Sequence, residues 1–272
     1  MNYPPILPDE RVDEVNESIR LIQKKQGLTF GTDAYLLAAF TRPSPRARAV
    51  DLGSGTGIIP LLLLARSKVA TAVAVEIQPS FAELIRRNAD LNRFGDRLHA
   101  ICADVRELKP TDLDGEVDLV LANPPYMRCD TGKRNEHDEK YIARHEVCGT
   151  VADFCHAAAR LLRHGGRFVT VWRPDRLTEL LAAMHAAKLE PKRMTFVHAD
   201  TASEPCMLLT EAVKGGAPSL RISPPLFLYT LAKNSGGTRT LTDTAQEIYD
   251  NCAFPSAFFS EQKIPYKKEN KT

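Results

Sequence analysis

Short runs of β-branched and apolar residues alternate with helical stretches from about residue 48 onward. This alternation is typical of βαβ units and predicts a mostly parallel sheet. The last two strands are separated by a polar turn, which indicates an antiparallel hairpin at the sheet's edge. We predict strands within 47–55, 71–76, 97–104, 117–125, 166–172, 191–200 and 204–213, and helices within 57–67, 79–94, 150–166 and 174–189.

Weaker patterns flank this core. Residues 19–30 have extended character, and residues 32–40 are typical of a helix that Thr32 or Asp33 can cap. Residues 220–229 are interrupted by prolines and are expected to lie over the surface, and the last dozen residues to form a disordered tail. We predict one α/β domain with an extension at each end. The predicted ranges are 1–30 for the first extension, 31–232 for the domain and 233–272 for the second extension and tail.

Composition narrows the class of protein. The chain has 272 residues, of which 43% are hydrophobic and 26% charged, as in ordinary globular domains. Its six cysteines form no CxxC or CxxH pattern, so we expect no metal site and a reducing cytoplasm. The amino end lacks the pattern of a signal peptide, and no apolar run is long enough to span a membrane. A net charge of +2 excludes a strongly basic nucleic-acid binder, so an RNA partner must be argued from the site.

A glycine-rich turn follows the first strand of the predicted domain, in the sequence Asp51-Leu52-Gly53-Ser54-Gly55-Thr56-Gly57. Three alternate glycines let the backbone turn sharply and approach a ligand without interference from Cβ atoms. The amino end of a helix then points at that ligand. Similar turns occur in nicotinamide and flavin enzymes, so the turn alone does not choose the cofactor.

Acidic residues near the turn bear on the choice of cofactor. Glu76 ends the second strand about twenty residues after the turn, where a carboxylate accepts both hydroxyl protons of an adenosine ribose, which fits either NAD or S-adenosylmethionine. Two further acids favour S-adenosylmethionine. Asp51 opens the turn, which suits a cationic sulfonium with an ammonium group better than a pyrophosphate. Asp104 follows the third strand, where it can accept from the adenine amino group or simply cap the stretch after it.

The fourth strand ends in Asn123-Pro124-Pro125-Tyr126. An exocyclic amino group on a purine is a poor nucleophile, because its lone pair is delocalised into the ring. The Asn123 amide oxygen and the Pro124 carbonyl can each accept one of its hydrogens and aim the lone pair at a methyl sulfonium. Pro125 would keep the loop rigid and Tyr126 would stack on the flat acceptor. The motif therefore predicts amino-group methylation, although it can also be a turn that ends a strand.

The motifs DLGSGTG, VEIQ and ANPPY together resemble the amino-methyltransferases of the class I fold, which modify adenine N6 in DNA or RNA, or glutamine N5 in release factors. The segments LIQKKQGLTFGTDAYLLAAF, YIARHEV and LEPKRMTFVHAD are more specifically similar to bacterial tRNA adenine-N6 methyltransferases. Those enzymes modify adenine 37, beside the anticodon of a valine tRNA. The resemblance covers about residues 10–232. It implies a Rossmann-like three-layer sandwich with a seven-stranded sheet, S-adenosylmethionine as cofactor and tRNA as partner.

The resemblance also assigns roles to residues. Phe30 and Asp33 would lie beside the methionine end of the cofactor, and Asn123 beside both cofactor and acceptor. The polar segment 127–146 is expected to act as a lid. By the resemblance, cofactor binding would rest on Asp51, Gly53, Gly55, Gly57, Glu76 and Asp104, and Arg144 and His145 would contact substrate at the mouth of the site. If the polar segment orders on substrate binding, Arg128, Lys133 and Arg134 can contact phosphates of the substrate.

Other functions compete with tRNA methylation. Glutamine-N5 methylation of a release factor shares the chemistry, but that family places a helical bundle before the core, for which the first 30 residues are too few. A DNA adenine methyltransferase would ordinarily need an added recognition domain. A binding protein without catalysis would have no use for the two proton acceptors of the intact Asn123-Pro124 pair.

Overall fold

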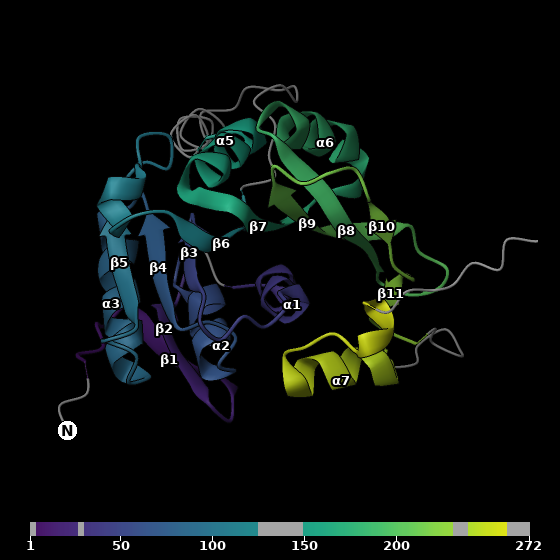
Figure 1. Ribbon diagram of the computed structural model, residues 1–272. Coiled ribbons are helices and arrows are strands. Elements are labelled where there is room, and N and C mark those ends of the chain that lie inside the picture. Colours follow the sequence, from purple (N-terminus) through teal and green to yellow (C-terminus); the bar gives the residue numbers. More distant parts are fainter. Residues whose placement is uncertain (1–3, 27–29, 125–148, 231–238, 260–272) are drawn as a thin grey trace, which may run out of the picture.

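The computed structural model describes residues 4–26, 30–124, 149–230 and 239–259 (Figure 1). Its main sheet contains β3 (Arg48–Leu52), β4 (Thr71–Glu76), β5 (Leu98–Cys102), β6 (Val117–Ala122), β7 (Leu162–Trp172), β8 (Leu189–His198), β9 (Pro205–Lys214), β10 (Arg221–Ile222) and β11 (Leu226–Phe227). The spatial order is β10-β8-β9-β7-β6-β3-β4-β5, and β11 also pairs with β8. Only β9 runs antiparallel to its neighbours among these described strands.

The mostly parallel sheet and the antiparallel pair β8–β9 are confirmed. The predicted count of seven strands is wrong by two, because β10 and β11 extend the sheet beyond β8. Each of these strands has two residues, which is too short to give a recognisable alternation.

Helices cover both faces of the sheet (Figure 1). Along β6, Leu119 and Leu121 enter one hydrophobic core, while Val120 and Ala122 enter the other. Because both faces are buried, residues 119–122 of this strand are all apolar, and the predicted three-layer α/β sandwich is confirmed. The helices on the first core are α1 (Thr32–Phe40), α2 (Ile58–Ala65), α3 (Pro79–Leu91) and α7 (Asp243–Asn251), and those on the second are α5 (Val151–Leu161) and α6 (Leu177–Ala186). None of the helices in the described ranges is long and apolar enough to cross a membrane.

The amino-terminal segment forms a hairpin of β1 (Glu10–Asn16) and β2 (Ile19–Lys24). It packs on α3, where asparagine side chains bind the free edge of β2. Asn92 accepts from Arg20 N at 2.9 Å and donates to Arg20 O at 2.7 Å, and Asn88 bonds to Ile22 in the same way. Two amides one helical turn apart thus take the place of a neighbouring strand.

The carboxyl-terminal region corrects part of a second expectation, that residues 220–229 lie over the surface. Leu220 and Ile222 are exposed, but Leu226 and Leu228 are only 1% and 5% exposed, because β11 pairs with β8 and Leu228 N donates to the His198 carbonyl. Helix α7 then packs against α1, where the Tyr35 hydroxyl donates to the Tyr249 carbonyl at 2.5 Å. Leu226, Leu228 and α7 are therefore part of the same hydrophobic core as α1. The last dozen residues lie outside the described residues.

Candidate active site

The glycine-rich turn joins β3 to α2 at the carboxyl end of the sheet. Gly53, Gly55 and Gly57 have φ angles of 70°, 56° and 82°, a region that favours glycine. At Gly57 a Cβ atom would also lie 3.2 Å from Ile85 Cγ2. The three glycines therefore form the sharp backbone turn that the sequence predicts before the amino end of α2.

Two buried carboxylates lie beside this turn. Asp51 is 1% exposed and Glu76 6%. Asp51 Oδ2 accepts from Ser54 Oγ at 2.5 Å, whereas its Oδ1 has no hydrogen-bond partner among the described residues. Glu76 accepts from Gly55 N at 2.9 Å and from Gln78 N at 3.0 Å. Burial raises the pKa of Asp51 to about 7 and also raises that of Glu76.

This arrangement fits S-adenosylmethionine. A buried carboxylate oxygen without a partner is costly, and a bound cation would relieve that cost. The alternate glycines bring the backbone of the turn close to these carboxylates, as the bond from Gly55 N to Glu76 shows. The described residues contain no group of three or more His, Cys, Asp or Glu side chains suited to a metal ion.

Asp104 follows β5 but is bound locally. Its carboxylate accepts from Arg106 N at 2.9 Å and pairs with the Arg106 guanidinium at 2.5 Å, which holds the pKa of Asp104 below its usual value. The capping interaction is therefore present. Its predicted contact with an adenine amino group remains a prediction.

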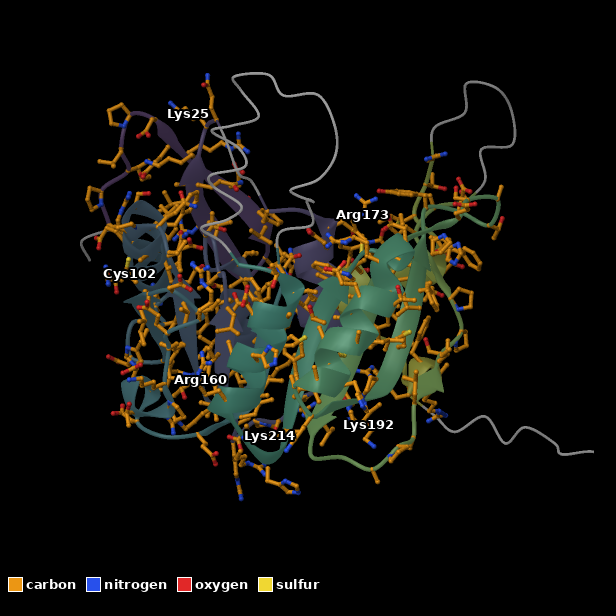
Figure 2. The ribbon with its side chains drawn as sticks, turned by 90° about the horizontal axis from the view of Figure 1, so that it is seen from above. Lys25, Cys102, Arg160, Arg173, Lys192 and Lys214 are labelled. Carbon is orange, nitrogen blue, oxygen red and sulfur yellow. The ribbon has the colours of Figure 1, made fainter. Side chains whose placement is uncertain are left out.

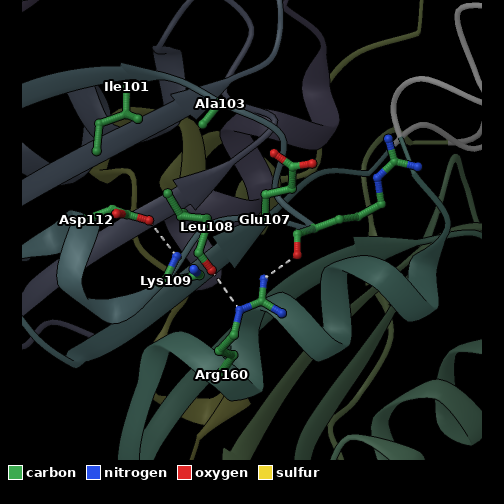
Figure 3. A pocket seen from close by; sticks show the side chains of 8 residues that line it. Ile101, Ala103, Glu107, Leu108, Lys109, Asp112 and Arg160 are labelled. Atoms are coloured by element: carbon green, nitrogen blue, oxygen red, sulfur yellow. Dashed lines mark hydrogen bonds between the residues drawn. The ribbon is translucent and has the colours of Figure 1, made fainter.

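A hollow of about 840 Å³ lies between the end of β5 and α5 (Figure 3). Arg160 of α5 reaches across to it and donates to the carbonyls of Leu108 at 2.7 Å and Arg106 at 3.1 Å. Because Nε and one terminal nitrogen of the Arg160 guanidinium donate to backbone carbonyls, this side chain connects α5 to the loop that carries Asp104. The sequence offered no signal for this contact, because an arginine on a helix is usually solvated.

Asn123 follows β6, which lies next to β3 in the sheet. Its Nδ2 donates to Asp33 Oδ2 at 2.9 Å, and Asp33 Oδ1 accepts from Ala34 N at 2.9 Å. Asp33 lies in the first turn of α1, so residues 90 positions apart in the chain meet at the site. Pro124 is buried.

Phe30 packs against the core on the side of α1 and α2. The other predicted positions lie outside the described residues. They are Pro125, Tyr126, Arg128, Lys133, Arg134, Arg144 and His145.

A second hollow, of about 820 Å³, lies at the ends of β7 and β9, and we call it the β7–β9 hollow. Asp33 belongs to its wall, together with Trp172, Pro174 and Met207. In the sheet, β7 and β9 lie on the opposite side of β6 from β3 and β4. The glycine turn and this hollow therefore flank Asn123. Figure 2 shows Arg173, also in the wall, at the edge of the molecule opposite to Lys192 and Lys214.

Asn88 is a functional candidate that the sequence analysis missed. It is fully buried, and its Nδ2 donates to Thr56 O in the glycine turn and to Ile22 O in β2, each at 3.0 Å. Its Oδ1 accepts from Ile22 N at 2.7 Å. This amide joins the turn to the amino-terminal hairpin. A polar residue on the apolar face of an amphipathic helix was the available signal.

We expect Asn88→Ala to lower the free energy of unfolding by about 3 kcal/mol, because it leaves buried backbone groups of Ile22 and Thr56 unpaired. It should also weaken cofactor binding, since the turn loses a support. Urea unfolding and calorimetry measure the two effects. Asn92→Ala is the matched control with a smaller expected loss, because water can replace its exposed bonds to Arg20. Equal losses in both variants would contradict this role.

The chain is similar to known methyltransferases. Residues 24–190 match the family model described as the methyltransferase small domain. The tRNA1(Val) (adenine(37)-N6)-methyltransferase of Porphyromonas gingivalis is 30% identical over 187 residues, covering 66% of this chain and 72% of that protein. The protein of the same name from Bacteroides fragilis is 28% identical over 232 residues, covering 84% of this chain and 88% of that protein. A solved structure, a predicted O-methyltransferase from Agrobacterium tumefaciens, has a TM-score of 0.64 at 23% identity, over 82% of this chain and 98% of that one.

Proposed function

The chain belongs to the methyltransferase small domain family and uses S-adenosylmethionine as methyl donor, and from this we propose that it methylates the N6 amino group of an adenine in tRNA. The proposed acceptor is adenine 37 of a valine tRNA, because the similar proteins of Porphyromonas gingivalis and Bacteroides fragilis are named for this nucleotide. Adenine in a single-stranded loop can leave the stack at little cost and enter a pocket. We propose that the enzyme acts in the cytoplasm.

One observation carries the proposal. Asn123 stands between the glycine turn and the β7–β9 hollow, and its amide is held by Asp33 at 2.9 Å. A cofactor on the turn and an acceptor base in the hollow would approach Asn123 from opposite sides. This is the arrangement that transfer between two bound reactants needs.

Bound S-adenosylmethionine supplies a methyl group on a positively charged sulfur atom. Asn123 Oδ1 and the Pro124 carbonyl each accept one hydrogen of the N6 amino group, which draws the nitrogen toward tetrahedral geometry. The lone pair would then be available for the methyl group instead of being delocalised into the ring. The nitrogen would form its bond to the methyl carbon as the bond from that carbon to sulfur breaks, and it would give up one proton to water. Asp51 and Glu76 would hold the cofactor through its ammonium and ribose groups, and Tyr126 would stack on the base.

The test is methyl transfer from labelled S-adenosylmethionine to tRNA that carries no modifications, followed by nucleoside analysis. Label in N6-methyladenosine of valine tRNA is the expected result. Label on a release factor and none on tRNA would instead support the glutamine-N5 alternative. Label on tRNA at another nucleoside would overturn the choice of adenine N6.

We expect cofactor affinity to depend on pH through Asp51, whose pKa burial raises to about 7 from an ordinary value of 3.8. The charged carboxylate attracts a cationic ligand and the protonated acid does not. Affinity should therefore fall as pH falls below 7, by about tenfold for each unit at most. Calorimetry between pH 5.5 and 7.5, a range chosen to span that raised pKa, measures the dissociation constant.

The protein without cofactor should respond in the opposite direction. Because the folded-state pKa of Asp51 is raised, protonation favours the folded chain, and this stabilisation is lost as pH rises through about 7. Thermal unfolding without ligand should thus occur at higher temperature at pH 6 than at pH 8. Asp51→Asn should flatten most of both dependences. If the variant kept the full pH dependence, Asp51 would not be the titrating group.

A further inference from the structure

The hydrogen bond between Asp33 and Asn123 bears on how the amide works. We propose that Asp33 is a positioning residue that fixes the orientation of the Asn123 amide, so that Oδ1 and not Nδ2 is presented to the acceptor amino group. This inference rests on the proposed role of Asn123. It is carried by two bonds to one carboxylate, from Asn123 Nδ2 and from Ala34 N, each at 2.9 Å.

An asparagine side chain has two ends of almost equal shape and opposite hydrogen-bonding character. Only the oxygen end can accept from an NH2 group, while the nitrogen end would place a donor against a donor. A carboxylate accepts and does not donate. Asp33 therefore selects the orientation in which Nδ2 faces it and Oδ1 points the other way.

The element that carries Asp33 is held at several points. At its carboxyl end, the buried Lys68 ammonium donates to the carbonyls of Ala38, Ala39 and Thr41 at 2.7, 3.0 and 2.9 Å. Near its amino end, the Tyr35 ring lies 5.1 Å from the Tyr249 ring of α7. The amino end of a helix also favours a negative charge in its first turn. The carboxylate therefore stands on a fixed support, as a positioning residue requires.

Asp33→Asn is the decisive substitution. Ala34 N and Asn123 Nδ2 bond to different oxygens of the Asp33 carboxylate, and an amide at position 33 keeps an acceptor at only one of these two places. If its oxygen keeps the bond to Ala34, its NH2 faces Asn123 and turns that amide around. We expect kcat to fall about a hundredfold, the size of effect seen when one aligned polar group is lost from an active site. KM for tRNA and the dissociation constant of S-adenosylmethionine should stay within about threefold.

A second substitution restores the pattern. With Asn123→Asp added to Asp33→Asn, the NH2 at position 33 donates to one carboxylate oxygen at 123, and the other oxygen accepts from the substrate. We expect kcat to recover at least about tenfold over Asp33→Asn alone. Asn123→Asp alone should be poor, because two carboxylates then face each other. Asp243→Asn is the matched control and should leave kcat unchanged. Asp243 is an exposed aspartate in the first turn of α7, and α7 has nine residues, as α1 does.

The side-chain NH2 resonance of Asn123 gives a readout that needs no substrate. It is identified by its disappearance in Asn123→Ala, and Asp33→Asn should shift it because a charge-assisted bond is lost. An unmoved resonance, or full activity in Asp33→Asn, would overturn the proposal. So would a loss confined to cofactor affinity and unrelieved by Asn123→Asp, which would assign Asp33 to the cofactor itself. A shifted resonance in a protein that never methylates tRNA would support the positioning role and refute the proposed substrate.

Discussion

Asn123→Ala is expected to reduce kcat by about a thousandfold, because it removes an acceptor that acts on the amino group in the transition state. S-adenosylmethionine should still bind within a few-fold of the original affinity, since Asp51 lies on β3 and Glu76 on β4, whereas Asn123 follows β6. Single-turnover transfer to valine tRNA measures the first quantity and calorimetry the second.

The matched control for this substitution is Asn251→Ala. Asn251 is an exposed asparagine at the end of α7, whose side chain donates to Glu247 O at 3.0 Å. It should leave both kcat and cofactor affinity unchanged. Parallel losses of transfer and of cofactor binding in Asn123→Ala would mean that Asn123 supports the cofactor site and does not act on the acceptor.

The parallel core of the fold could be predicted from the sequence because its signals are local. The run from Val117 to Ala122 is apolar at almost every position, which only a strand buried on both faces requires. The glycines of the turn predict a backbone conformation with positive φ angles, which other residues adopt only with strain. Since carboxyl ends of parallel strands share one edge, the sequence could also predict that Asp51, Glu76 and Asn123 lie near one another.

The remaining parts depend on contacts between distant segments. Nothing near Asp33 in the sequence indicates that its carboxylate binds Asn123, because that meeting depends on how α1 docks on the sheet. The hairpin of residues 10–24 is likewise completed by Asn88 of α3 and Asn92 at the carboxyl-terminal cap of this helix, more than 60 residues away. Such side-chain partners of a strand edge leave no periodic pattern in the strand itself.

Glu211→Ala should cause the largest loss of stability. Glu211 is fully buried and pairs with three arginines: it contacts Arg42, lies 3.3 Å from Arg193 and 3.5 Å from Arg167. Arg193 is itself 6% exposed and its guanidinium lies 3.6 Å from the centre of the Phe40 ring. Burial lowers the pKa of Arg193 to about 10, while the charge of Glu211 opposes that shift. Removing the carboxylate leaves a buried positive charge without its counter-ion.

The expected cost is about 4 kcal/mol, the usual range for a buried ion pair broken on one side. It should lower the unfolding temperature by about 10 °C in a chain of this size. Glu190→Ala is the matched control, because Glu190 is a partly exposed glutamate on the neighbouring strand β8 and should cost less than about 0.5 kcal/mol. If Glu211→Ala melted like Glu190→Ala, Arg193 would have to be stabilised by the rings of Phe40 and Phe259 alone. Removing Phe40 should then be the costlier change, because that ring faces the same guanidinium.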